Sequence, residues 1–297
     1  MNPDALPKPP TPEATPAPEQ TLSPVQPERT SSDLRGSGSN DFFPPIGEPL
    51  HVPPPDPAWN AWDVLRLVLM VIVSLFVGLL IALLIAHLWF YPHAHLAELA
   101  RMPLIAVAGQ SLAYVLIFAY MYVLVTRERR RPDFLAAIHW NFPSNIAVYV
   151  LSGFVLSLGL QAFSHFLPIP KELPIDTFFR TPAEAWALGI LSITLAPVME
   201  ELFFRGFLYP VLARSLGLPI AVFLTAFAFA LLHGAQLGFS WGPVLVIFLV
   251  GLVLTIVRAR KNSVAAGVLI HMAYNGTITV AMFAATDGFR HLEKLNQ

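Results

Sequence analysis

The chain has 297 residues, of which 55% are hydrophobic and only 12% are charged. Soluble domains carry about 25% charged residues, so this composition argues against an ordinary soluble protein. The formal net charge of -1 gives no support for a nucleic-acid partner. The absence of cysteine excludes disulfides, thiolate zinc ligands and a cysteine nucleophile.

The first 57 residues differ in composition from the rest of the chain. They hold 16 of the 28 prolines, and their eight acidic residues outnumber three basic ones. Such a segment cannot bury enough apolar surface to fold, so residues 1–57 are predicted to be a disordered, acidic, proline-rich tail. It lacks the basic start and apolar core of a signal peptide. We expect a solvated tether, and a polyproline ligand for a partner domain is the alternative.

Residues 58–286 predict an all-α membrane-embedded bundle, followed by a short C-terminal tail at 287–297. A membrane-spanning helix needs about 20 apolar residues, and long stretches here lack Asp, Glu, Lys and Arg, as between Arg214 and Arg258. Seven spans are expected, or eight if one of them is split. Their predicted ranges are 64–88, 104–125, 145–167, 185–208, 218–235, 242–258 and 263–284.

The basic residues predict the orientation of these spans. They gather after the second span (127–131), after the fourth (Arg214) and after the sixth (258–261). Basic loops stay in the cytoplasm, and all three fall on one side if there are seven spans. We therefore expect a multi-pass protein with a cytoplasmic N-terminus. If the chain is bacterial, its membrane is the plasma membrane; in a eukaryote, the endoplasmic reticulum is the analogous place.

The fourth span carries three charges within six residues, Glu200, Glu201 and Arg205. Each charge at a helix centre costs about 2.5–3.5 kcal/mol on insertion scales. Glu201 and Arg205 are four residues apart with the acid first, which favours an ion pair on one helix face. Glu200 is rotated by about 100° and lacks that partner. A capping cluster at a helix end is the alternative, but the neighbouring residues are apolar.

Two histidines occupy comparable positions in later spans. His233 follows Phe229 by four residues near the end of the fifth span, and His271 and Asn275 share one face of the seventh. A lone histidine on a helix is more often structural than catalytic. Together with an intramembrane glutamate pair, however, these residues are hard to explain by packing, because buried charged groups need partners.

These side chains are the set that hydrolysis by an activated water requires. A carboxylate acts as general base toward water, and a histidine shares or aligns that water. An asparagine amide and a second histidine can donate hydrogen bonds to the oxyanion of a tetrahedral intermediate. The same set could instead bind zinc through Glu200, His233 and His271, with water in the open position. The sequence leaves both alternatives, no cofactor or Zn²⁺, open.

The pattern Glu200-Glu201-x-x-x-Arg205, Phe229-x-x-x-His233 and His271-x-x-x-Asn275 resembles the three motifs of the CPBP family. These are the CAAX prenyl endopeptidases and bacteriocin-processing enzymes, also called Abi proteins, and the resemblance covers about residues 185–285. It implies an intramembrane endopeptidase in which Glu200 is the base and His233 assists at the water.

The same resemblance implies roles for the remaining motif residues. His271 and Asn275 would form the oxyanion site, while Glu201, Arg205 and Phe229 would be structural support. The implied substrate is a membrane-associated protein or peptide, prenylated or not. The bilayer and this substrate are the expected partners, and the sequence indicates no oligomeric state.

Two other functions use parts of this pattern. A non-catalytic immunity or scaffold protein of the same fold would bind a partner in the membrane, but it has no need for the complete Glu–His–His set. A proton-coupled transporter would use intramembrane Glu and His as a relay. Transporters often show internal repeats with interrupted helices. No repeat is evident here, although Pro197 could break the fourth span.

Overall fold

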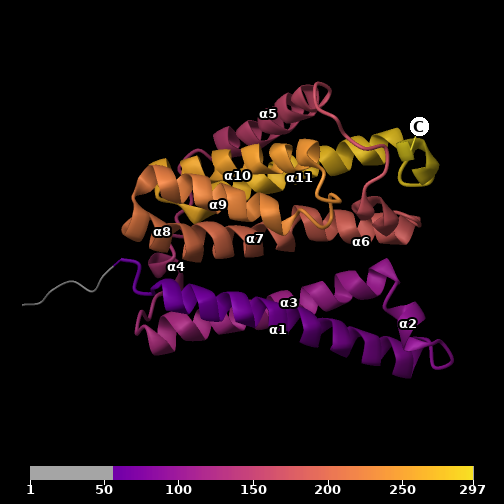
Figure 1. The fold of residues 1–297 in the computed structure, drawn as a ribbon, viewed down its shortest axis with the longest axis horizontal. Coiled ribbons are helices and arrows are strands. Elements are labelled where there is room, and N and C mark those ends of the chain that lie inside the picture. The colour runs from indigo at the N-terminus through magenta and orange to yellow at the C-terminus, as the bar shows by residue number, and fades with distance from the viewer. Residues whose placement is uncertain (1–55, 297) are drawn as a thin grey trace, which may run out of the picture. The chain divides into compact units, whose positions relative to one another are not determined.

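The computed structural model describes residues 56–296 and contains helices but no strand in that range (Figure 1). This confirms the all-α prediction, whereas almost all of the predicted tail, 1–57, lies outside the described residues. The helices are α1 (Ala61–Ile85), η2 (Ala86–Phe90), α2 (Leu96–Leu99), α3 (Pro103–Val123), η3 (Leu124–Glu128), α4 (Phe134–Ala137), α5 (Ile146–Ser164), η4 (Pro174–Phe178), α6 (Pro182–Ile193), α7 (Leu195–Glu201), η5 (Leu202–Leu208), α8 (Tyr209–Leu216), α9 (Leu218–Leu232), α10 (Trp241–Lys261), α11 (Val264–Ala285) and η6 (Leu292–Asn296).

Within residues 56–296, six helical segments are long and apolar enough to cross a membrane. They correspond to six of the seven predicted spans, and the fourth is longer than expected, since it runs from Pro182 to Leu216. The predicted span at 218–235 is α9, an apolar helix of only 15 residues. It rises about 22 Å, less than the roughly 30 Å of a hydrocarbon core. This helix is therefore too short to cross the core by itself if it runs straight through it.

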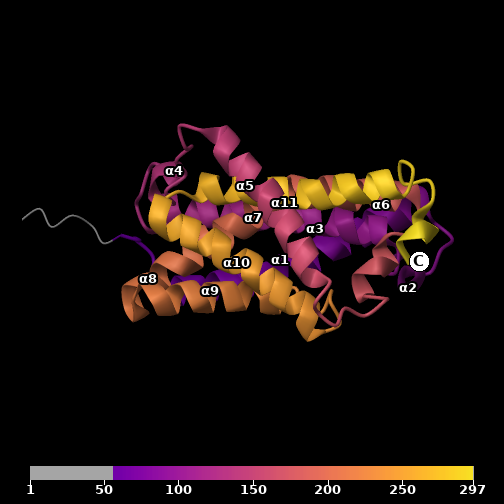
Figure 2. The same ribbon diagram turned by 90° about the horizontal axis from the view of Figure 1, so that it is seen from above.

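The helix segment that carries the glutamate pair lies in the middle of the bundle. On one side, α6 and α7 contact α3, which pairs with α1 as an antiparallel hairpin (Figure 1). On the other side they contact α11, which is covered in turn by α5 and α10. Figure 2 shows α5 crossing α11 obliquely. A Cβ atom on Gly153 of α5 would lie 2.3 Å from the carbonyl oxygen of Ile270, so only glycine allows this approach.

The long fourth segment is interrupted just before the glutamates. The helix breaks at Thr194, whose φ of -108° and ψ of -84° are not helical. Pro197 follows three residues later, and because proline has no N–H it cannot pair with the carbonyl of Ile193. The predicted break is thus present. After Glu201 the chain continues as the π-helix η5, a form that is rare and frequent at functional sites.

The residues before α1 connect the α1–α3 hairpin to η5. The indole N–H of Trp59 donates to the carbonyl oxygen of Phe207 at 3.1 Å, and the two rings stack with centroids 4.7 Å apart. Arg214 of α8 donates to the carbonyl oxygens of Pro57 and Trp59. This contact holds the start of α1 beside the segment that carries the glutamates.

We expect the α1–α3 crossing to be sensitive to a single methyl group. A Cβ atom on Gly78 would lie 2.3 Å from the carbonyl oxygen of Gly109, a backbone atom that has no room to move away. Gly78→Ala should therefore lower the free energy of unfolding by about 1–3 kcal/mol, the usual range for overpacking. Thermal unfolding in detergent measures it. Gly159→Ala in α5 is the matched control, because nothing lies within 4 Å of its added Cβ. Equal effects of the two changes on the melting temperature would contradict the close approach of α1 and α3 at Gly78.

The orientation predicted from the basic loops remains to be measured. Figure 1 places α4, α8 and the start of the described chain at one end of the bundle, with the C-terminal residues and α2 at the other. Arg130→Cys should accordingly react with a membrane-impermeant maleimide only from the cytoplasmic side, and Arg290→Cys only from outside. The native chain has no cysteine to interfere. Reaction of both positions from the same side would contradict the predicted topology.

Candidate active site

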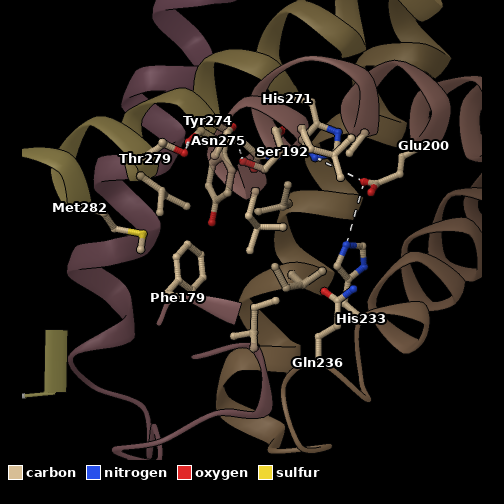
Figure 3. A pocket seen from close by; sticks show the side chains of 18 of the residues that line it. Phe179, Ser192, Glu200, His233, Gln236, His271, Tyr274, Asn275, Thr279 and Met282 are labelled. Carbon is tan, nitrogen blue, oxygen red and sulfur yellow. Dashed lines mark hydrogen bonds and ion pairs between the residues drawn. The ribbon is translucent and has the colours of Figure 1, made fainter. Parts of the chain in front are cut away.

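Side chains from three separate helices converge on Glu200. Glu200 lies in α7, His233 directly follows α9, and His271 belongs to α11. The Nε2 atoms of His233 and His271 lie 4.0 Å and 3.7 Å from the same Oε2 atom of Glu200 (Figure 3). The structure therefore brings together three of the predicted catalytic residues. The end of α9 matters here, because His233 is its C-cap and lies beside Glu200.

The hydrogen bonds of the two histidines determine which ring nitrogen carries the proton. Nδ1 of His233 lies 2.8 Å from the carbonyl oxygen of Phe229, which can only accept, so this Nδ1 donates. Nδ1 of His271 lies 3.1 Å from Oε1 of Glu201, a carboxylate oxygen that also accepts from Arg205. In each neutral ring, Nε2 then holds a lone pair. Both lone pairs are on the side that faces Glu200.

A buried ion pair holds this arrangement in place. Arg205 donates from Nη1 to Oε1 of Glu201 at 2.9 Å, and both side chains are fully buried. The guanidinium also donates to the carbonyl oxygen of Gly251 at 2.9 Å and to Oγ1 of Thr255 at 3.3 Å, both in α10. Its Cζ lies 4.7 Å from the ring centre of Phe229. The pair predicted from the i, i+4 spacing is present, and it joins η5 to α10.

Gly267 provides the space that the Glu201 carboxylate occupies. A Cβ atom at this position would lie 2.5 Å from Oε2 of Glu201. Within residues 56–296, that buried oxygen has no hydrogen-bond partner. The sequence analysis did not single out Gly267. A glycine one turn before His271 on the same helix face was the available signal.

Asn275 lines the same cavity as Glu200 and shares a helix face with His271, as expected (Figure 3). Its Nδ2 donates at 2.8 Å to the carbonyl oxygen of Ser192, near the end of α6. The amide therefore already supports the backbone beside the helix break. Its assignment as an oxyanion donor stays a prediction. The support role expected for Phe229 fits its contacts, since its ring lies 4.7 Å from that of His233 and 5.7 Å from that of His271.

Two cavities meet at Glu200. The first, of about 250 Å³, lies between α6, α11 and the segment around Phe179. The second, of about 700 Å³, lies among α1, α3, η5 and α9, and its lining is mostly aliphatic and aromatic. Both are lined by Gln110, Glu200, His233 and Gln236. The two glutamines were not predicted, because a neutral amide in an apolar helix gives a weaker signal than a charge.

The zinc alternative was tested against the positions of these side chains. Two atoms that share a tetrahedral zinc lie roughly 3.4 Å apart, given ligand distances near 2.1 Å. The separations of 3.7 Å and 4.0 Å from Glu200 are wider. Among the described residues, no group of three His, Asp or Glu side chains is arranged to hold a metal ion. The side chains as they lie do not fit a zinc site.

Comparison with known proteins agrees with this geometry. Residues 182–277 match the family model described as type II CAAX prenyl endopeptidase Rce1-like. This segment is therefore similar to that family. The match confirms the resemblance to CPBP proteins and supports a protease at the level of the family. It covers about a third of the chain, including all three motifs but neither α1 nor α3. No curated protein and no solved structure matches the chain.

Arg205 is expected to be required for folding as well as for activity. Arg205→Ala would leave the buried Glu201 carboxylate with His271 as its remaining partner, and breaking a buried pair typically costs about 3–5 kcal/mol. We expect a corresponding loss in a thermal melt, together with loss of activity. Arg101→Ala is the matched control, because Arg101 is exposed.

The double change Glu201→Gln with Arg205→Gln separates charge from packing. It removes both charges and keeps polar side chains of similar length, so it should be more stable than Arg205→Ala alone. If the double variant melts at a lower temperature than Arg205→Ala, the broken ion pair is not the cause of the instability of Arg205→Ala.

Proposed function

We propose that this protein is an intramembrane endopeptidase in which Glu200 activates a water molecule to hydrolyse a peptide bond. The observation that supports it most directly is the approach of two histidine Nε2 atoms to one oxygen of Glu200, in a bundle whose long apolar helices could cross a membrane. Arg205 forms an ion pair with Glu201, whereas no lysine or arginine among the described residues forms one with Glu200. Such a carboxylate suits a base better than a structural acid.

The protonation pattern of the site explains how a water would be held. Glu200 and the Nε2 atoms of His233 and His271 are all acceptors in the neutral site. A water among them donates to two, which leaves its own lone pairs free to attack a carbonyl carbon. Glu200 takes one proton as the new C–O bond forms. The same proton passes to the amide nitrogen as the C–N bond breaks, so Glu200 is regenerated.

The oxyanion of the tetrahedral intermediate needs hydrogen-bond donors. His271 becomes one when it also carries a proton on Nε2, and the Glu201 carboxylate at its Nδ1 offsets the charge of the imidazolium. Asn275 has a second N–H besides the one bonded to Ser192. These assignments follow the roles that the family resemblance implies.

We propose that the substrate is a membrane-associated protein or peptide whose apolar part occupies the larger cavity. This cavity is lined by aliphatic residues of α1 and aromatic residues of η5, and it reaches Glu200 and His233. An isoprenoid chain attached near the scissile bond matches that lining, and the matched family is described as CAAX prenyl endopeptidases. The smaller cavity then receives the peptide on the other side of the bond.

Glu200→Gln is expected to abolish turnover while substrate binding persists. The amide keeps the shape of the side chain but cannot take a proton, and general-base catalysis contributes about 10²–10⁴-fold in rate. Cleavage of matched farnesylated and unmodified peptides by purified protein measures it. Glu98→Gln is the control, since Glu98 is an exposed carboxylate outside the site.

Two further measurements accompany this assay. Cleavage in ¹⁸O water should place one label in the new carboxyl group, and no acyl-enzyme should accumulate. Full activity of Glu200→Gln would contradict the proposed base. Loss of activity with a chelator, restored by stoichiometric zinc, would contradict the metal-free mechanism while leaving the same residues at the site.

A further inference from the structure

The three motifs supply more acceptors than donors around the reacting atoms. Glu200 and the two Nε2 atoms accept, and Asn275 already uses one N–H for the carbonyl oxygen of Ser192. Peptide hydrolysis places negative charge on the carbonyl oxygen, and preorganised donors at that position are among the largest contributions to catalysis. A donor on the remaining side of Glu200 would complete the site.

Helix α3 presents such a donor. Gln110 and Tyr114 lie one turn apart on α3, and Nε2 of Gln110 donates to the hydroxyl oxygen of Tyr114 at 2.7 Å. Both side chains line the larger cavity together with Glu200. Because the tyrosine oxygen accepts this bond, its own hydrogen remains to be donated. Within the described residues, no other hydrogen bond to that hydroxyl is formed.

The other tyrosine of the site differs in position. Tyr274 lines the smaller cavity, and Figure 3 shows its hydroxyl directed toward Phe179, away from Glu200. Tyr114 lines the larger cavity together with Glu200 and His233, which is the cavity proposed above for the apolar part of the substrate. Of these two tyrosines, only Tyr114 lines the cavity that His271 and Asn275 do not line.

We propose that Tyr114 is a catalytic residue that donates a hydrogen bond to the carbonyl oxygen of the scissile bond, and that Gln110 is the positioning residue that turns the hydroxyl toward it. No bond is made or broken at Tyr114; its hydrogen bond strengthens as the oxygen becomes negative. The proposal rests on the proposed function. It adds a helix outside the matched residues 182–277 to the active site.

Kinetics of Tyr114→Phe test the proposal with the farnesylated peptide as substrate. The change removes one hydroxyl and keeps the ring, so kcat should fall by about 10²–10³, the usual loss for one oxyanion donor, with KM unchanged. Tyr122→Phe is the matched control, because Tyr122 lies on the same helix and is 48% exposed. Unchanged kcat in Tyr114→Phe, or a rise in KM alone, would overturn the proposal.

Two variants of Gln110 distinguish positioning from packing. Gln110→Glu replaces the donor by an acceptor that captures the tyrosine hydrogen, so kcat should fall as in Tyr114→Phe. Gln110→Met fills similar space without accepting that hydrogen, so it should lose less. Equal losses in the two variants would indicate a structural role and overturn the positioning role of Gln110.

The same assay separates this proposal from the one on which it rests. If Glu200→Gln abolishes cleavage and Tyr114→Phe leaves kcat at the wild-type value, only the role of Tyr114 is wrong. If the wild-type protein shows no Glu200-dependent cleavage, both proposals are wrong. Melting temperatures of all variants accompany the kinetics, and a wild-type value for Gln110→Glu keeps the test valid even where Tyr114→Phe is less stable.

Discussion

The ion pair between Glu201 and Arg205 is the interaction on which the site depends. Two charges removed from water are tolerated only when their hydrogen-bonding capacity is nearly filled. Arg205 meets this condition by bonding to Glu201, to the backbone of Gly251 and to Thr255. Glu201 in turn orients His271. One pair of charges thus fixes α7 and η5 against α10 and sets the ring of a histidine on a third helix.

The interruptions of the helices accompany the convergence of the reacting groups. The break at Thr194 and the π-helix η5 leave Glu200 in a seven-residue helix, α7, whose direction is independent of a continuous span. The 15 residues of α9 end at Leu232, directly before His233. If every span were an uninterrupted helix, the position of each of these side chains along the bundle would be fixed by its place in the sequence alone. Here the irregular backbone is enclosed by protein, which is where a membrane tolerates it.

The features of this structure that can be predicted from the sequence are those marked by charged residues or by long uncharged stretches. The spans follow from long uncharged stretches, and the Glu201–Arg205 pair follows from i, i+4 spacing. The π-helix does not, because its register depends on how Arg205 packs against α10. The bond from Asn275 to the carbonyl of Ser192 depends in the same way on tertiary contact. Tyr114 is missed for another reason, since neutral polar residues in an apolar helix leave no distinct pattern.

Phe229 shows why the motif residues act as a unit. Its carbonyl oxygen accepts from His233, which fixes that ring with its lone pair toward Glu200. Its aromatic ring lies against His271 and under the guanidinium of Arg205. One apolar residue therefore contacts both histidines and the cation that stabilises Glu201. Neither histidine can turn its Nδ1 toward Glu200 without losing a bond to Phe229 or Glu201. Because each ring is held at Nδ1, the acceptors around Glu200 are set before any substrate arrives, as preorganised catalysis requires.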